Sequence, residues 1–250
     1  ETGKIPSGLT PEEDEIMRQM KEEFNYWYPV DLRVSGKDLI HNHLTMALYN
    51  HALFFPEKMP QSYFTNGHLQ LDGEKMSKST GNFITLREAI ETYSADALYL
   101  ALASAGEGMS DGNLTTHRNV GKEIRSSDGK VKKQTGSSMD EAIDTLTGIY
   151  NWFNLRTTLM KTTTLRKCKY HQIDQLFQVR INQCIQLANK YYQEMKYSEV
   201  VKECIYQMIN IRNQYEQDIQ SLDINYHSEI LERYMIVQLQ LMAPLTPHLA

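Results

Sequence analysis

From residue 140 onward, apolar side chains recur at alternating steps of three and four residues in four separate stretches. The stretches cover residues 143–153, 177–191, 201–215 and 230–241. On an α-helix this spacing places the apolar side chains on one face, turn after turn. Four amphipathic helices joined by polar loops predict an antiparallel bundle over residues 140–250, and these faces are expected to form its core.

The first 105 residues have the pattern of an α/β domain. Val30, Leu32 and Val34 alternate with polar residues, which predicts a β-strand. Gly36-Lys37-Asp38 ends the strand, and a helix that contains His43 is expected to follow. A strand, a glycine and a helix in this order form half of a repeating unit of a doubly wound sheet, whose ligands bind beyond the carboxyl ends of the strands. The glycine would let a flat base approach the backbone, and the acidic side chain could bind both ribose hydroxyls, although Gly-x-Asp by itself is more often a simple turn.

Capping and turn residues place the other elements of this domain. Residues 10–13 (Thr-Pro-Glu-Glu) predict the start of a short helix with a capping box, and residues 1–9 precede it as a linker. Residues 62–71 predict two short strands around a tight Asn66-Gly67 turn. A second turn at Asp72-Gly73 leads into the most distinctive motif of the chain.

That motif is Lys75-Met76-Ser77-Lys78-Ser79, followed by Thr80-Gly81-Asn82. Two ammonium groups three residues apart could neutralise the charge that develops on a leaving pyrophosphate. The hydroxyl residues could cap backbone N–H groups at the start of the next helix, where the helix dipole favours an anion. By composition alone, two lysines beside serines are also typical of a solvated surface loop. Helices are then expected over residues 83–93 and 94–103, the second with Ser94 as its N-cap.

Residues 106–139 contain many glycines, serines and charges and no apolar periodicity, so we interpret them as a polar linker or surface insertion without regular structure. A solvated linker and an RNA-contacting loop are both consistent with its excess of positive charge. Between residues 115 and 138 the basic residues are Arg118, Lys122, Arg125, Lys130, Lys132 and Lys133, and the acidic ones are Glu123 and Asp128.

A second basic group lies in the first loop of the predicted bundle and consists of Lys161, Arg166, Lys167 and Lys169. These side chains could face an RNA phosphate backbone, or they could simply solubilise the helix ends. The 250-residue chain has a net charge of −5, so it is not a polycation as a whole. Any RNA contact must therefore use a local basic patch of this kind.

The apolar content of 41% is that of a globular protein with a sizeable core. The sequence contains no run of about twenty apolar residues, so it predicts no membrane span. The three cysteines, Cys168, Cys184 and Cys204, are widely spaced and form no Cys-x-x-Cys pair. We therefore expect reduced thiols in a cytosol-like compartment, and neither a disulfide framework nor a metal site.

The lysine motif resembles the second ATP-binding motif of the class I aminoacyl-tRNA synthetases. Gly36-Lys37-Asp38 after a strand, the lysine motif after a hairpin, and an all-helical bundle occur in the order typical of that family. The string from Tyr26 to Ile40, the string from Asn66 to Leu69 and the closing string from Leu241 to Leu249 are similar to those of leucyl-tRNA synthetases of the archaeal and eukaryotic cytosolic kind. The similar parts cover residues 16–113 and 140–250 and leave 114–139 as an insertion.

The resemblance implies the second half of a Rossmann-like catalytic domain in residues 1–105, a linker in 106–139 and an anticodon-binding-type bundle in 140–250. It places the ATP ribose at Asp38 and the adenosine near Gly36. It also places the ATP at Met76, Ser77 and Ser79, with Met76 against the adenine through its backbone. Lys75 and Lys78 would be the catalytic residues that hold the triphosphate. His43 would lie at the leucine pocket, although a purely structural histidine fits as well; a structural role is also expected for Asp96.

The activity implied is that of a leucine–tRNA ligase in the cytoplasm, which uses ATP with Mg²⁺, leucine and tRNA(Leu), needs no other metal, and acts as a monomer. The first ATP motif of the family, His-x-Gly-His, and its editing domain are absent from this sequence. We therefore expect the chain to be a piece of a longer protein and to be inactive by itself. Two alternatives are a methionyl-tRNA synthetase and a non-catalytic tRNA-binding module.

Overall fold

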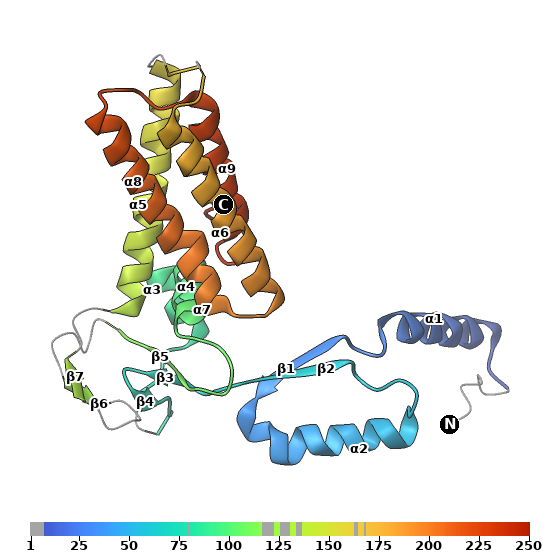
Figure 1. The fold of residues 1–250 in the computed structure, drawn as a ribbon. Helices are drawn as coiled ribbons and strands as arrows, with labels where there is room; N and C mark the ends of the chain where they lie inside the picture. Colours follow the sequence, from blue (N-terminus) through green and yellow to red (C-terminus); the bar gives the residue numbers. More distant parts are fainter. Residues whose placement is uncertain are drawn as a thin grey trace. The chain divides into compact units, whose positions relative to one another are not determined.

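The computed structural model describes residues 8–79, 81–116, 123–125, 131–133, 137–162, 165–167 and 169–250. The chain forms two compact units (Figure 1). Unit 1 contains the residues up to His68 together with Gly108–Ser110, and unit 2 contains Leu69–Glu107 and Asp111–Ala250.

Unit 1 is built around two parallel strands, β1 (Leu32–Gly36) and β2 (Ser62–Asn66), which pair from Leu32 opposite Ser62 to Gly36 opposite Asn66. The chain between them is helical, as predicted from the residues after Gly36. It begins as the 3₁₀ turn η1 (Lys37–Leu39), continues as the π-helical turn η2 (Ile40–Leu44) and ends as α2 (Thr45–Phe54). A strand, a helix and a parallel strand make the α/β unit that the sequence predicts.

Helix α1 (Pro11–Trp27) precedes these strands and begins where its capping residues predict. The Thr10 hydroxyl accepts a hydrogen bond from the Glu13 N–H, and the Glu13 carboxylate accepts one from the Thr10 N–H at 2.8 Å. These reciprocal bonds satisfy two backbone donors that a helix start leaves open. The helix ends at Trp27.

Unit 2 begins with a three-stranded sheet in the order β4 (Glu74–Lys75), β3 (Leu69–Leu71), β5 (Gly112–Leu114). Strand β3 is antiparallel to β4 and parallel to β5. The predicted hairpin around Asn66-Gly67 is wrong, because β2 pairs with β1 whereas β3 pairs with β4 and β5. The hairpin of this region turns instead at Asp72-Gly73.

Two short helices follow, α3 (Leu86–Tyr93) and α4 (Ala95–Ser104). Helix α3 begins three residues later than expected, because Thr85 and Glu88 form a capping box there. The Ser94 hydroxyl accepts a hydrogen bond from the Ala97 N–H, which confirms Ser94 as the cap of α4.

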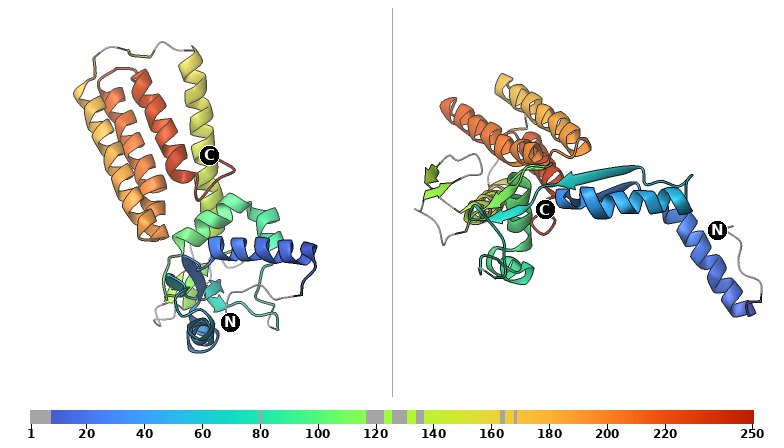
Figure 2. Two further views of the ribbon diagram at one scale, coloured as in Figure 1. Left: turned by 90° about the vertical axis from the view of Figure 1, so that its right-hand side faces the viewer. Right: turned by 90° about the horizontal axis from the view of Figure 1, so that it is seen from below.

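The four predicted helices of the bundle are confirmed. They are α5 (Ser138–Thr162), α6 (Gln172–Gln193), a helical run from Tyr197 to Ser221, and α9 (Ser228–Met242). The run consists of α7 (Tyr197–Val201), the π-helical turn η4 (Lys202–Gln207) and α8 (Met208–Ser221). Both figures show these helices side by side (Figures 1 and 2).

Their apolar faces form two buried clusters. One joins α3, α4 and α5 to α7, and its centre includes Leu100, Ile149 and Val200. The other joins α6, α8 and α9 through residues such as Phe177, Ile211 and Tyr234. Cys184 and Cys204 are buried free thiols within these clusters, as predicted.

The basic insertion contains an antiparallel pair of strands, β6 (Glu123–Arg125) and β7 (Val131–Lys133), with Ile124 opposite Lys132. The prediction of irregular structure is therefore wrong for these strands and for β5. Several residues named in the sequence analysis lie outside the described part of the chain. They are Arg118, Lys122, Lys130 and Asp128 of the insertion, Thr80, Cys168, and residues 1–7 of the expected linker. Within the part of the chain that the structure describes, no helix has both the length and the apolar character needed to cross a membrane.

Candidate functional site

The carboxyl end of strand β1 carries the two residues proposed to bind the nucleoside. Gly36 is the last residue of β1, and Asp38 lies in the short turn that follows. A Cβ atom on Gly36 would lie 2.7 Å from Oδ1 of Asp38, so a larger residue would force the carboxylate to move. The Asp38 side chain is 59% exposed, and its Oδ1 lies 3.7 Å from Nε2 of His68. Its carboxylate therefore remains accessible to hydroxyl donors of a ligand.

His43 lies in the π-helical turn η2 of the same unit and is exposed. The guanidinium of Arg33, on strand β1, donates a hydrogen bond to Nε2 of His43, and the His43 N–H donates to the Asn42 side chain. A guanidinium can only donate, so Nε2 of His43 is the acceptor in this contact. Arg33 orients this ring, and sequence reasoning missed it because its only local signal is a polar position in an alternating strand.

The lysine motif lies in unit 2, on a loop whose base is fixed. Lys75 ends strand β4 opposite Gln70, and Met76 packs against the first apolar cluster. The Ser77 N–H donates to the Asn82 carbonyl at 3.1 Å, and the Asn82 side-chain amide donates to the Leu71 carbonyl at 3.3 Å. These two bonds join the ends of the loop to each other and to strand β3 of the hairpin. The side chains of Lys75 and Lys78 are both exposed, where they could reach an anion.

The serines of this motif do not cap the next helix, contrary to the prediction. Ser77 Oγ and Ser79 Oγ lie 2.8 Å apart and share a hydrogen bond, whereas Thr85 caps α3. The motif therefore presents two lysines and two hydroxyls on a loop, and the start of α3 is capped by another residue. A capping box at Thr85 and Glu88 is visible in the sequence and could have placed this helix start.

The expected site residues fall into two groups. Gly36, Asp38 and His43 belong to unit 1, whereas the motif from Lys75 to Ser79 belongs to unit 2. Within the first group the structure places Asp38 against Gly36, and within the second it joins Ser77 to Ser79.

The basic group at the end of α5 and in the loop that follows it has two kinds of members. Lys161, Lys167 and Lys169 are exposed. Arg166 is largely buried, and its guanidinium forms two hydrogen bonds with Asp174, at 2.8 and 3.1 Å. Because the guanidinium of Arg166 is already bonded to a buried carboxylate, we assign Arg166 a structural role. We keep only the three lysines as expected RNA contacts.

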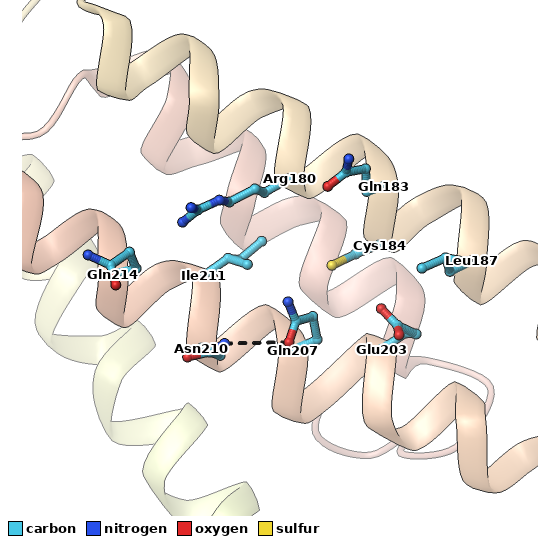
Figure 3. A pocket seen from close by; sticks show the side chains of 9 residues that line it. All are labelled: Arg180, Gln183, Cys184, Leu187, Glu203, Gln207, Asn210, Ile211 and Gln214. Carbon is cyan, nitrogen blue, oxygen red and sulfur yellow. Dashed lines mark hydrogen bonds between the residues drawn. The ribbon is translucent and has the colours of Figure 1, made fainter.

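A groove of about 390 Å³ runs between α6 and the segment formed by η4 and α8 (Figure 3). Figure 3 shows carboxamides along it, with Asn210 and Gln207 joined by a hydrogen bond of 3.5 Å. Burial, with a smaller contribution from Glu203, raises the pKa of the Cys184 thiol to about 11, so this group is no nucleophile near neutral pH. The groove is lined by Arg180, Gln183, Cys184, Leu187, Glu203, Gln207, Asn210, Ile211 and Gln214. It lacks the adjacent cations of the lysine loop, so we place no ATP chemistry there.

Two family models match this chain. Residues 17–107 match the model for the class I (C) tRNA synthetase catalytic domain, and residues 174–250 match the model for the anticodon-binding domain of tRNA ligases. The first match contains the strand-end residues and the lysine loop, and the second contains most of the helical bundle.

Curated leucine–tRNA ligases are similar to this chain over most of its length. The chain is 38% identical to the cytoplasmic leucine–tRNA ligase of Neurospora crassa over 238 residues and 37% identical to that of Pongo abelii over 239 residues. These alignments cover 94% of this chain and 19% and 18% of the relatives, so the chain spans about a fifth of their length.

Among solved structures, the ternary complex of Agrobacterium radiobacter K84 agnB2 LeuRS with tRNA and LeuAMS matches with a TM-score of 0.64 at 14% identity, over 88% of this chain and 26% of that one. Mycobacterium tuberculosis methionyl-tRNA synthetase with methionyl-adenylate matches with a TM-score of 0.65 at 16% identity, over 97% and 45%. At these identities the two structures establish the fold.

Proposed function

Because residues 17–107 and 174–250 match the catalytic and anticodon-binding domains of class I tRNA synthetases, we propose that the full-length protein is a leucine–tRNA ligase. The observation that carries the proposal is the lysine loop, which exposes Lys75 and Lys78 on a hairpin with a fixed base. The identity to cytoplasmic leucine–tRNA ligases supports leucine as the amino acid.

The first step is the activation of leucine. A carboxylate oxygen of leucine attacks the α-phosphorus of ATP, which enters with its Mg²⁺ as substrate. The new bond forms leucyl-adenylate, and the bond to the β-phosphate breaks so that pyrophosphate leaves with its electron pair. Lys75 and Lys78 neutralise the charge that grows on this leaving group. Catalysis by such groups is positioning plus electrostatic stabilisation, with no covalent protein intermediate.

The residues of unit 1 bind the rest of the substrates. The exposed Asp38 carboxylate accepts hydrogen bonds from the ribose hydroxyls of ATP, and Gly36 leaves space for the adenosine. His43, oriented by Arg33, lies at the leucine side chain. The backbone of Met76 contacts the adenine, and the hydroxyls of Ser77 and Ser79 supply hydrogen bonds to ATP.

In the second step a ribose hydroxyl at the end of tRNA(Leu) attacks the leucyl carbonyl of the adenylate. The ester bond to tRNA forms, and AMP leaves. Lys161, at the end of α5, and Lys167 and Lys169, in the loop that follows, contact the phosphate backbone of the tRNA. The enzyme acts in the cytoplasm as a monomer.

The test is amino-acid-dependent exchange of pyrophosphate into ATP by the full-length protein, with leucine, methionine, isoleucine and valine compared at equal concentration. Exchange driven best by leucine is the expected result. Exchange driven by methionine would leave the reaction in place and change the substrate. A folded protein that binds tRNA but supports no exchange with any of the four would be a non-catalytic tRNA-binding module.

A further inference from the structure

The turn that leads into the lysine loop is bonded to a distant segment of the chain. Asp72 and Gly73 both have left-handed backbone angles, with φ of 54° and 83°, as a two-residue hairpin turn requires. The Asp72 N–H donates to the Leu114 carbonyl at 2.7 Å, and the Gly73 N–H donates to the Asn113 side chain at 2.7 Å. Both acceptors belong to strand β5.

The carboxylate of Asp72 adds two more hydrogen bonds to the same segment. Its Oδ1 accepts from the Thr116 N–H at 2.7 Å, and its Oδ2 accepts from the Thr116 hydroxyl at 2.7 Å. Thr116 is 5% exposed, and Leu114 is 2% exposed. Hydrogen bonds to a charged group in such a shielded place are stronger than neutral ones at the surface. We call this arrangement of Asp72 and Thr116 the turn clamp.

The residue before Thr116 continues the connection to the helical bundle. The Thr115 N–H donates to Ser138 Oγ at 3.0 Å, and the Ser138 N–H donates to Thr115 Oγ1 at 2.7 Å. The Ser137 hydroxyl donates to the Thr115 carbonyl at 2.9 Å. Since α5 begins at Ser138, the turn clamp joins the hairpin of the lysine loop to the first turn of that helix.

The pairing of strand β4 by itself fixes the direction of the hairpin only weakly. Strand β4 has two residues and pairs with β3 at Gln70–Lys75 and Leu71–Glu74. A ladder this short is marginal by itself. The direction in which Lys75 leaves the sheet therefore depends on the turn two residues earlier, which the clamp holds.

We propose that Asp72 and Thr116 are positioning residues for the lysine loop, which they hold in the orientation that places Lys75 and Lys78 against the pyrophosphate of ATP. The proposal rests on the proposed function. Misplacing a reacting group by about 1 Å can cost about a hundredfold in rate, so removal of the clamp should reduce the rate of activation more than the binding of leucine.

The test compares Thr116→Val, which keeps the shape and removes the hydroxyl, with Thr116→Ser, which restores it. Thr158→Val is the matched control, because the exposed Thr158 hydroxyl bonds within α5, to the Asn154 carbonyl. In pyrophosphate exchange by the full-length protein, Thr116→Val should lower kcat about tenfold with the KM for leucine unchanged. Thr116→Ser and Thr158→Val should stay within about twofold of wild type.

A second readout does not require activity. Trypsin cleaves after Lys75 and Lys78 when the loop can leave the hairpin, and mass spectrometry gives the rate at each site. Thr116→Val should speed cleavage at these two lysines about tenfold and leave the other sites unchanged. Asp72→Asn should act in the same direction, since asparagine tolerates the left-handed turn but lacks the charge.

The outcomes separate the two proposals. Wild-type kcat and cleavage in both Thr116→Val and Asp72→Asn would overturn the clamp, as would a reduced kcat that Thr116→Ser fails to restore. If wild-type protein shows no exchange with any amino acid, the proposed function fails. The clamp as a positioning device for catalysis then fails with it, even where the cleavage rates show that Asp72 and Thr116 hold the loop.

Discussion

The guanidinium of Arg166 donates two hydrogen bonds to the carboxylate of Asp174, from Nη2 to Oδ1 at 2.8 Å and from Nη1 to Oδ2 at 3.1 Å. The Asp174 side chain is fully buried, and that of Arg166 is 16% exposed. The carboxylate also accepts hydrogen bonds from the Tyr215 hydroxyl and the His171 N–H, each at 2.7 Å. The pair therefore ties the loop before α6 to the start of α6 and to α8.

Removing one partner of this pair should destabilise the bundle. Arg166→Met leaves a buried carboxylate without its cation, which costs about 3–5 kcal/mol. The loss of unfolding free energy is measured by urea unfolding, followed by the fluorescence of Trp152. A Trp27→Phe background removes the other tryptophan. Lys190→Met is the control, because Lys190 pairs with Glu194 at 4.0 Å on the surface of the same bundle. It should change stability by at most about 1 kcal/mol, and equal destabilisation in both variants would contradict the prediction.

The same pair should make the bundle sensitive to acid. Burial by itself would raise the pKa of Asp174, but the hydrogen bonds from Arg166, Tyr215 and the His171 N–H outweigh it and hold this pKa below its ordinary value. The unfolded chain, with a pKa of about 3.9 at this group, then binds the proton more readily than the folded one. The stabilisation is present above about pH 5 and is lost as the pH falls through the unfolded and then the folded pKa.

Urea midpoints measured from pH 7 to pH 2.5 check this dependence. Asp174→Asn should be less stable than wild type at pH 7, and the difference should shrink as the pH falls. Glu216 is a second group whose pKa, despite burial, is held low by Tyr226, Arg156 and Trp152, so an acid slope should remain in the variant. Parallel curves for the two proteins would show that Asp174 does not titrate with folding.

The three exposed lysines at the end of α5 and in the loop that follows it should contribute to tRNA affinity. Replacing Lys161, Lys167 and Lys169 by glutamine should weaken tRNA(Leu) binding and reduce the slope of log K against log salt by about one for each phosphate that is no longer neutralised. Filter binding by the full-length protein at several salt concentrations measures both. A matched triple variant, Lys190, Lys196 and Lys202 to glutamine, removes the same charge near the opposite end of α6. If the two triple variants weaken tRNA binding equally, the effect of these lysines comes from net charge and not from a specific contact.

The helices of this fold were predictable because their signal is local. Phe177, Ile181 and Cys184 repeat with the period of a helix, and all three are buried. Thr10 and Glu13 indicate a helix start for the same reason, since both halves of the capping box lie within four residues. The exposed lysine loop after a tight Asp72-Gly73 turn was predictable on similar grounds.

What could not be predicted depends on partners that are distant in sequence. The residues on either side of Asn66-Gly67 have strand character, but nothing local shows that β2 pairs with β1 and β3 with β5. Arg166 looked like a surface charge, because its burial against Asp174 arises only when α6 and α8 pack together. The Asp72–Thr116 clamp joins residues 44 positions apart and was invisible for the same reason.

A buried carboxamide in the bundle should be replaceable at no cost. The Gln238 side chain, on α9, is fully buried, and neither of its polar atoms has a hydrogen-bond partner among the described residues. An unsatisfied buried amide costs about 1–3 kcal/mol. Gln238→Met keeps the volume and should leave stability unchanged or raise it by about 1 kcal/mol. The urea titration above measures it, with the exposed Gln186→Met as the neutral control; destabilisation by more than about 1 kcal/mol would reveal a polar partner for Gln238.

The lysine loop should act on the transition state of activation. Lys78→Ala should slow leucyl-adenylate formation by about 10²–10³, the usual effect of removing one group that stabilises developing charge. Lys75→Ala should act in the same direction. Single-turnover formation of the adenylate by the full-length protein, measured at saturating ATP and leucine, isolates this step from product release. Lys190→Ala, which removes a lysine from the bundle surface, should react at the wild-type rate. Wild-type rates in Lys78→Ala at both saturating and subsaturating ATP would take Lys78 out of the mechanism. A loss of rate only at subsaturating ATP would make Lys78 a group that binds ground state and transition state alike.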